Sequence, residues 1–205
     1  MATIAARPFD FKLDPARVAL IVIDMQRDFL EPGGFGEALG NDVAELRAAI
    51  APCAAALDAA RAHDMLVIHT REGHRPDLAC APPAKLNRGE PQKRIGDPGP
   101  MGRILVRGEH GHDIIDELAP APGEIVLDKP GKGAFHQTDL AQILINRGID
   151  TLIVCGVTTE ICVHTTIREA NDRGYHGVAR PDACAASLPG FRRVGRDVMK
   201  AQGGV

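Results

Sequence analysis

The sequence contains no tryptophan, and aromatic residues make up only 3% of its 205 residues. A folded core must therefore be built mainly from Ala, Val, Ile and Leu, which are plentiful in a chain that is 44% hydrophobic. No apolar run approaches the ~20 residues that cross a bilayer. The N-terminal stretch MATIAARPFDFKLDPAR also lacks the apolar segment of a secretion signal. These absences predict a globular protein of the cytoplasm with no membrane partner.

The charge and cysteine content exclude further classes. The formal net charge is −3, and both signs are mixed along the sequence. This balance argues against nucleic acid or anionic lipid as a partner. The cysteines are odd in number and irregularly spaced, which predicts reduced thiols in a reducing compartment. They are Cys53, Cys80, Cys155, Cys162 and Cys184.

Short apolar runs alternate with helical patterns, and the length indicates a single domain over residues 1–205. This order predicts an α/β fold of three layers, α/β/α, with a mostly parallel sheet and helices on both faces. The long segment 71–111 is irregular, and loops of that length are often functional. We expect strands at 18–24, 65–70, 124–128, 151–155 and 175–179, and helices at 42–63 (N-capped by Asp42), 137–147, 159–173 and 191–202.

Three residues that could perform acyl-transfer chemistry follow predicted strands, where ligands bind in parallel sheets. Asp24 ends the first strand, Lys129 follows the third, and Cys162 lies in the first turn of the helix after the fourth. A thiol attacks a carbonyl only as thiolate, so it needs a base. Asp24 could be that base, and Lys129 could stabilise the thiolate and hold the carboxylate in place. A helix start favours negative charge on sulfur and supplies N–H groups for an oxyanion hole.

Each of these residues also has a structural interpretation. Asp24 could cap a helix or form an ion pair, Lys129 could be an exposed turn residue, and Cys162 could be a small core residue. Their joint occurrence at strand ends favours catalysis. Among the other cysteines, Cys155 and Cys53 are expected in the core. Packing is the safer interpretation of Cys184, and the role of Cys80 is open.

The stretches ALIVIDMQRDF, VLDKPGKGAF and GVTTEICVHTT resemble the isochorismatase-like cysteine hydrolases, in the same order along the chain. The resemblance implies their fold, with Asp24 as general base, Lys129 as electrostatic partner and Cys162 as nucleophile. Members of that family have a cis peptide bond that would here join Val157 to Thr158. The N–H of Thr158 would then form the oxyanion hole together with that of Cys162.

Further stretches are most similar to the biuret hydrolase branch and its triuret-cleaving relatives: IHTREGHRPDL, IGDPGPMGRILVRGE, DKPGKGAF, REANDRGY and KAQGGV. The resemblance implies a small carbamoylated urea as substrate, with Lys132 and Gln202 at its carbonyl and amide groups. Phe29 and Phe35 would wall a small flat pocket. The structural alternatives are a solvated loop charge for Lys132, a helix-end residue for Gln202, and core positions for the two phenylalanines.

A metal site is weakly indicated. The nicotinamidase branch holds a metal through an Asp-x-His pair, and the matching stretch here is Glu72-Gly73-His74. One such pair is a weak signal, so we predict no metal and no cofactor. We expect instead that Glu72, Arg71 and His74 form a network that fixes the loop.

The predicted reaction is cysteine-dependent hydrolysis of a terminal C–N bond through a thioester. Triuret would give carboxybiuret and then biuret, and biuret would give allophanate, each with release of ammonia. Two alternatives stay open: another small amide (an N-carbamoyl compound, maleamate or nicotinamide), or a thiol redox sensor or binding module without catalysis.

Segment 71–111 is expected to set the pocket length. The resemblance also implies a homo-oligomer, a dimer or tetramer.

Overall fold

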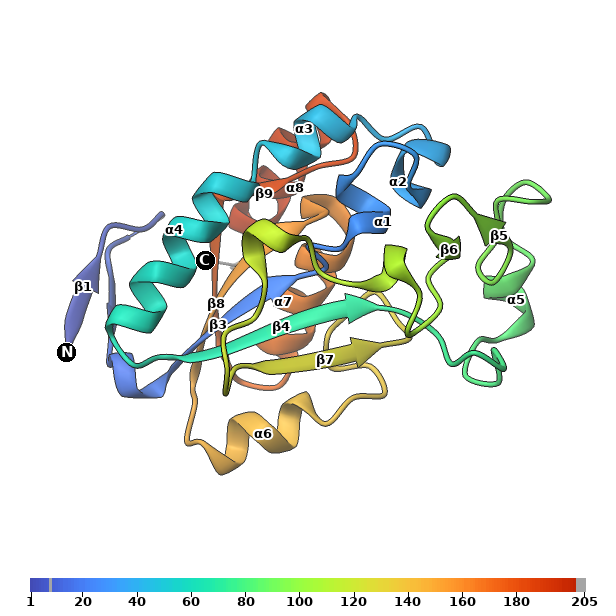
Figure 1. Ribbon diagram of the computed structural model, residues 1–205. Helices are drawn as coiled ribbons and strands as arrows, with labels where there is room; N and C mark the ends of the chain where they lie inside the picture. Colours follow the sequence, from blue (N-terminus) through green and yellow to red (C-terminus); the bar gives the residue numbers. More distant parts are fainter. Residues whose placement is uncertain (8, 202–205) are drawn as a thin grey trace.

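The computed structural model describes residues 1–7 and 9–201. Its centre is a parallel sheet in the order β7-β4-β3-β8-β9 (Figure 1). The five expected strands are all present in it: β3 (Val18–Ile23), β4 (Leu66–Glu72), β7 (Ile125–Lys129), β8 (Thr151–Val157) and β9 (His176–Ala185). Two short antiparallel pairs lie outside it: β1 (Ala2–Ile4) with β2 (Phe11–Leu13), and β5 (Pro98–Gly99) with β6 (Gly102–Arg103).

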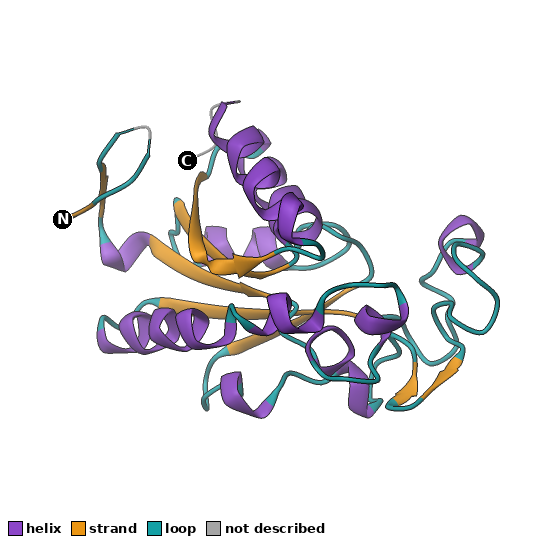
Figure 2. Ribbon diagram, turned by 90° about the horizontal axis from the view of Figure 1, so that it is seen from above, coloured by secondary structure: helices purple, strands orange, loops and turns teal. Residues whose placement is uncertain are grey.

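Helices cover both faces of the sheet, which makes the three-layer α/β/α fold that the sequence predicts (Figures 1 and 2). The connection from β3 to β4 runs toward one edge of the sheet and the connections after β7 and β8 run toward the other. Because such crossovers are right-handed, α4 lies on one face and α6 and α7 lie on the opposite face. The helices and turns are η1 (Pro15–Arg17), α1 (Arg27–Leu30), α2 (Phe35–Ala38), α3 (Val43–Arg47), α4 (Ile50–Ala62), α5 (Pro83–Leu86), η2 (His110–His112), η3 (Asp116–Leu118), α6 (Leu140–Asn146), η4 (Thr159–Val163), α7 (His164–Asp172) and α8 (Pro189–Ala201).

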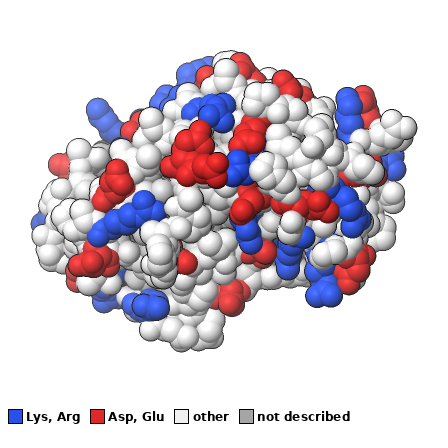
Figure 3. Space-filling model, in the orientation of Figure 1, with Lys and Arg blue, Asp and Glu red and all other residues white. Residues whose placement is uncertain are grey.

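The core and the surface follow the composition. All six residues of β3 are buried, as expected for a central strand that is covered on both faces. On the face shown in Figure 3, acidic and basic side chains are interspersed. Within residues 1–7 and 9–201, no helix is both long and apolar enough to cross a membrane.

The helix expected at 42–63 is divided into α3 and α4. Asp42 caps α3, and its side chain accepts a hydrogen bond from the N–H of Glu45 at 3.1 Å. The break at Ala48 and Ala49 follows from Pro52, which has no N–H for the carbonyl of Ala48 and whose ring would collide with it.

Gly156 lies where β8 shifts register against β9, directly before the turn that leads to Cys162. Its φ of +112° is in the region that favours glycine, and an added Cβ would lie 2.1 Å from the carbonyl oxygen of Ile23. Ile23 precedes Asp24. The absence of a side chain at position 156 therefore lets the end of β3 and the turn that leads to Cys162 approach each other.

We predict that Gly156→Ala destabilises the fold by more than ~4 kcal/mol, because the methyl group collides with backbone in the central sheet. Gly148→Ala is the matched control, since Gly148 also has a positive φ of +63° but open space around its Cβ position. The control should lose only ~1–2 kcal/mol. Urea unfolding of both variants measures the difference, and equal losses would contradict the steric explanation.

Candidate active site

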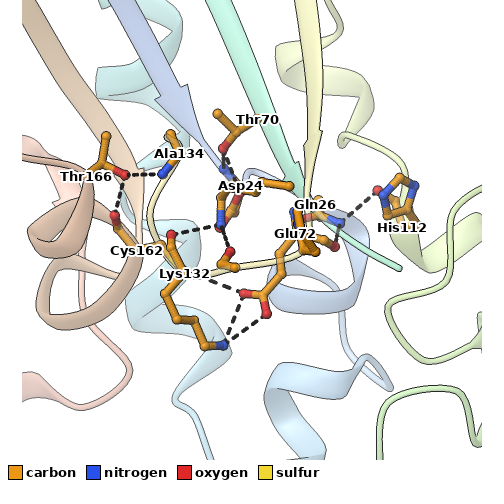
Figure 4. Close-up of polar contacts among 12 residues, drawn as sticks. Asp24, Gln26, Thr70, Glu72, His112, Lys132, Ala134, Cys162 and Thr166 are labelled. Atoms are coloured by element: carbon orange, nitrogen blue, oxygen red, sulfur yellow. Dashed lines mark hydrogen bonds and ion pairs between the residues drawn. The ribbon is translucent and has the colours of Figure 1, made fainter. Parts of the chain in front are cut away.

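Four functional side chains meet at the carboxyl ends of the parallel strands (Figure 4). Asp24 follows β3, Glu72 ends β4, Lys129 ends β7, and Cys162 lies in the π-helical turn η4 after β8. The structure thus brings together Asp24, Lys129 and Cys162, the three residues that the sequence places at strand ends. Glu72 joins them.

Asp24 and Lys129 form a fully buried ion pair, with 2.7 Å between Oδ2 and Nζ. Asp24 Oδ1 also accepts a hydrogen bond from Thr70 Oγ1 at 2.6 Å. Lys129 Nζ donates to the carbonyls of Gly131 and Lys132, each at 3.0 Å. Buried charges need such further hydrogen bonds to offset their desolvation.

The positive charge of Lys129 is stabilised by the anionic groups around it. Burial would lower the pKa of Lys129, but the negative charges that face it, above all that of Asp24, offset this and raise the pKa. Lys129 therefore stays an ammonium group at any physiological pH.

The Cys162 thiol is 5% exposed and lies 3.8 Å from Oε2 of Glu72. Burial raises the pKa of Cys162, and the opposing effect of Lys129 is smaller. The resting thiol is therefore protonated, and attack on a carbonyl requires a base close by. A carboxylate oxygen of Asp24 lies within 4.8 Å of the sulfur. This geometry suits Asp24 as that base.

The peptide bond between Val157 and Thr158 is cis, as the resemblance implies. Both residues line a cavity together with Cys162. The oxyanion-hole role of Thr158 and Cys162 stays a prediction.

Glu72 is a fully buried carboxylate that binds two lysines, of which Figure 4 labels Lys132. Its Oε1 lies 2.9 Å from Lys85 Nζ, and both of its oxygens lie 3.1 Å from Lys132 Nζ. Burial would raise the pKa of Glu72, but Lys129, Lys132 and Lys85 together lower it to about 2. Glu72 is thus a permanent anion next to the thiol of Cys162.

The expected network of Glu72, Arg71 and His74 is present only in part: Glu72 and His74 each contact a residue of segment 71–111, whereas Arg71 binds residues outside it. Side chains alternate along β4, so Glu72 faces Cys162 while Arg71 points to the other side and pairs with Asp128 at 2.8 Å. The Nδ1 atom of His74 lies 3.4 Å from the sulfur of Cys80. Glu72 therefore belongs to the site.

Two further polar residues hold the site in place. The amide of Gln26 accepts from the N–H of Glu72 at 2.7 Å and donates to its carbonyl at 3.0 Å, which fixes the end of β4. Thr166 donates to the carbonyl of Cys162 at 2.7 Å and accepts from the N–H of Ala134 at 3.1 Å. Thr166 thereby joins the nucleophile turn to the loop after Lys129.

The cavity beside Cys162 has a volume of about 100 Å³. Three of the residues that the sequence assigns to substrate, Phe29, Phe35 and Lys132, line it, whereas Gln202 lies outside the described residues. Its lining is formed by Phe29, Phe35, Leu39, Asn41, Glu72, Lys132, Val157, Thr158, Ile161, Cys162 and Ser187. Of the segment 71–111 that is expected to set the pocket length, Glu72 lines this cavity, and no residue of 73–111 among those described does.

The donor atoms of Asp24, Glu72 and Cys162 lie within 4.8 Å of one another, a spacing that a metal ion could use. The ammonium groups of Lys129, Lys132 and Lys85 bind the two carboxylates, however, and would repel a cation. This set of residues does not fit a divalent metal.

The other cysteines lie outside the lining of the cavity beside Cys162. Cys53, Cys155 and Cys184 are at most 2% exposed, so the expected core positions are confirmed. Cys80 is partly buried beside His74.

Sequence reasoning missed two of the site residues in this role, Glu72 and Lys85. The signal for Glu72 was its position after the apolar run of β4, two residues beyond Thr70. Lys85 lies in α5, within the irregular segment, and no pattern around it indicates an active-site residue.

Comparison with known proteins agrees with this geometry. The model of the isochorismatase family, described as the isochorismatase domain, matches residues 18–205. A cysteine hydrolase from Pseudomonas syringae pv. phaseolicola 1448A is 30% identical over 100% of this chain and 92% of its own, with a TM-score of 0.80. An isochorismatase family protein from Desulfovibrio vulgaris subsp. vulgaris str. Hildenborough is 31% identical over 92% of both chains, with a TM-score of 0.77. N-carbamoylsarcosine amidase from Thermoplasma acidophilum is 27% identical over 90% of this chain and 93% of its own, with a TM-score of 0.68.

We predict that Glu72 makes the fold acid-sensitive. Its pKa falls from 4.5 to about 2 on folding, so its stabilising effect is complete above pH 4.5 and is lost as the pH falls toward 2. Between pH 6 and pH 3 the free energy of unfolding should drop by about 2 kcal/mol more in the parent than in Glu72→Gln.

Urea unfolding at several pH values measures both curves. The comparison isolates Glu72 from other groups that titrate in acid, such as His74, whose pKa burial lowers to about 4. Parallel curves for parent and variant would show that the neighbouring lysines do not lower the pKa of Glu72.

Proposed function

The chain belongs to the isochorismatase family, and we propose that it is a cysteine-dependent amidohydrolase of small carbamoylated ureas such as biuret and triuret. The observation that carries the proposal is the buried Asp24–Lys129 pair beside the thiol of Cys162, at the wall of a cavity of about 100 Å³. Drug-sized ligands occupy ~300–1,000 Å³, so this cavity suits a molecule of few atoms.

The mechanism begins with transfer of the Cys162 proton to Asp24 as the sulfur attacks a terminal carbamoyl carbon. The N–H groups of Thr158 and Cys162 hold the oxyanion. Ammonia leaves with the proton from Asp24, and a thioester remains. Asp24 then activates a water that hydrolyses the thioester and regenerates the thiol. Biuret gives allophanate, and triuret gives carboxybiuret, which loses carbon dioxide to form biuret.

The polar lining supports a urea-like substrate. Such molecules are rows of C=O and N–H groups, and each group that is buried without a partner costs binding energy. Lys132 can only donate and Glu72 can only accept, so the cavity offers both kinds of partner side by side, 3.1 Å apart. Phe29 and Phe35, whose rings are tilted by 52° with centroids 6.5 Å apart, add apolar surface to the lining.

Another N-carbamoyl compound is the second candidate. The similarity to an N-carbamoylsarcosine amidase favours a carbamoyl group in the substrate, without deciding what it is attached to. The non-catalytic alternative, a thiol sensor, has less support, because a sensor needs no ion pair such as that of Asp24 and Lys129.

The expected homo-oligomer stays a prediction. Phe191, Val194 and Val198 are 47%, 49% and 41% exposed along α8, an apolar stripe that suits self-association.

We predict that the purified protein releases ammonia from biuret or triuret, and that Cys162→Ser lowers the rate at least ~1,000-fold while it still binds the substrate. The measurement is ammonia release on biuret, triuret, nicotinamide, an N-carbamoyl amino acid and maleamate, with calorimetry for binding. Cys80→Ser is the matched control, since Cys80 is partly buried and does not line the cavity.

The ratio of the biuret and triuret rates identifies the preferred substrate. Turnover that survives in Cys162→Ser would contradict the mechanism. A folded parent that releases ammonia from none of the five compounds would contradict the substrate class.

A further inference from the structure

The proposed mechanism gives no role to one buried anion, the carboxylate of Glu72. Glu72 lines the cavity with Cys162 and Lys132, and its Oε2 lies 3.8 Å from the nucleophilic sulfur. Asp24 is already held by Lys129 and Thr70. A carboxylate that is 0% exposed beside the reacting atom needs a reason to be there.

The hydrogen bonds of Glu72 are distributed unequally. Its Oε1 accepts from two ammonium groups, those of Lys85 and Lys132. Its Oε2 accepts from Lys132 and, weakly, from the thiol of Cys162. A carboxylate has about four acceptor positions, and a thiol is a weak donor. When Cys162 gives up its proton, Oε2 loses this partner and one acceptor position faces the nucleophile.

We propose that Glu72 determines specificity for the proposed reaction: its Oε2 accepts a hydrogen bond from the N–H of the leaving nitrogen on the carbon that Cys162 attacks. This inference rests on the proposed function. A reacting carbon lies ~3–3.5 Å from the sulfur, so a nitrogen bonded to that carbon comes within reach of Oε2. The site then selects ureas and N-carbamoyl amides, and it disfavours esters, whose oxygen would face the carboxylate without a proton.

Lys85 is a positioning residue for Glu72. Its Nζ donates to Oε1 at 2.9 Å and also to the carbonyl of Pro130, and its side chain is only 17% exposed. With Lys132 it fixes Oε1, so that Oε2 points to the sulfur. Segment 71–111 therefore contributes to the site in two ways: Glu72 lines the cavity, and Lys85 positions Glu72.

The test compares two substrates that differ in one group. N-methylbiuret and methyl allophanate have the same size, but the N–H that carries the methyl group in the first is replaced by an ester oxygen in the second. The measured quantities are methylamine release from the amide and methanol release from the ester, each as kcat/KM. Their ratio cancels effects on the nucleophile and on the amount of folded protein.

Glu72→Gln reverses the polarity at this position. The two lysines hold the amide oxygen of the new side chain, and its NH₂ group turns toward the sulfur. The amide-to-ester ratio should fall at least ~10-fold, because an N–H of the substrate then meets a donor. If both rates fall by the same factor, Glu72 acts on the nucleophile or the fold and the inference is overturned.

Lys85→Met keeps the carboxylate but removes one of its supports, which protects the test against misfolding of Glu72→Gln. It should raise KM for N-methylbiuret more than it lowers kcat, and it should lower the amide-to-ester ratio. Lys93→Met is the control, since Lys93 lies in the same segment but pairs with Glu90 at the surface. Identical ratios in parent and Lys85→Met would overturn the role of Lys85.

The parent enzyme separates the two proposals. If it cleaves both compounds with a ratio that no variant changes, only the inference about Glu72 fails. If it cleaves only the ester, cysteine hydrolysis stands and selection for N–H is overturned. If it cleaves neither compound and none of the amide panel, the proposed function fails and the inference falls with it.

Discussion

The site depends on the buried ion pair of Asp24 and Lys129. Two opposite charges that water does not reach are stable only with near-ideal geometry and further hydrogen bonds. The sheet supplies both: the two residues end β3 and β7, and β4 between them contributes the hydroxyl of Thr70 to Asp24. Three neighbouring strands must therefore end at the same level for the pair to form.

The charges around the nucleophile are arranged for a reaction that creates an anion. The ammonium groups of Lys129, Lys132 and Lys85 face two carboxylates, which leaves one surplus positive charge when Cys162 is protonated. Burial nevertheless raises the pKa of Cys162, so the thiolate does not persist in the free protein. Under the proposed mechanism, sulfur passes its proton to Asp24 only as it attacks, so one negative charge moves from that carboxylate to the oxyanion and the three ammonium groups still face two negative charges.

The sequence predicts the fold and the three strand-end residues well because both depend on local patterns. Apolar runs mark the strands, and Asp24, Lys129 and Cys162 each follow one. The prediction ended β4 at residue 70, before Glu72, and so it lost the alternation that places Thr70 and Glu72 on one side. It also shortened β9, since Pro181 and Asp182 are poor strand formers, but β9 is an edge strand and tolerates them. The contact of Lys85 with Glu72 joins residues of different elements, and no local pattern encodes it.

Different elements form different parts of the cavity, and this affects which urea fits. The wall facing Cys162 is made by Phe29, Phe35 and Leu39, which belong to α1, α2 and the residue after α2. The long segment 73–111 contributes no lining residue among those described. Under the proposed function, the short helices after β3 would therefore control substrate length, the one difference between biuret and triuret. Under the inference drawn for Glu72, the polarity at the reacting carbon would be controlled separately, through Lys85 and Glu72. Substitutions at Phe35 or Leu39 should then change which of the two ureas is the preferred substrate, without changing the preference for N–H over an ester oxygen.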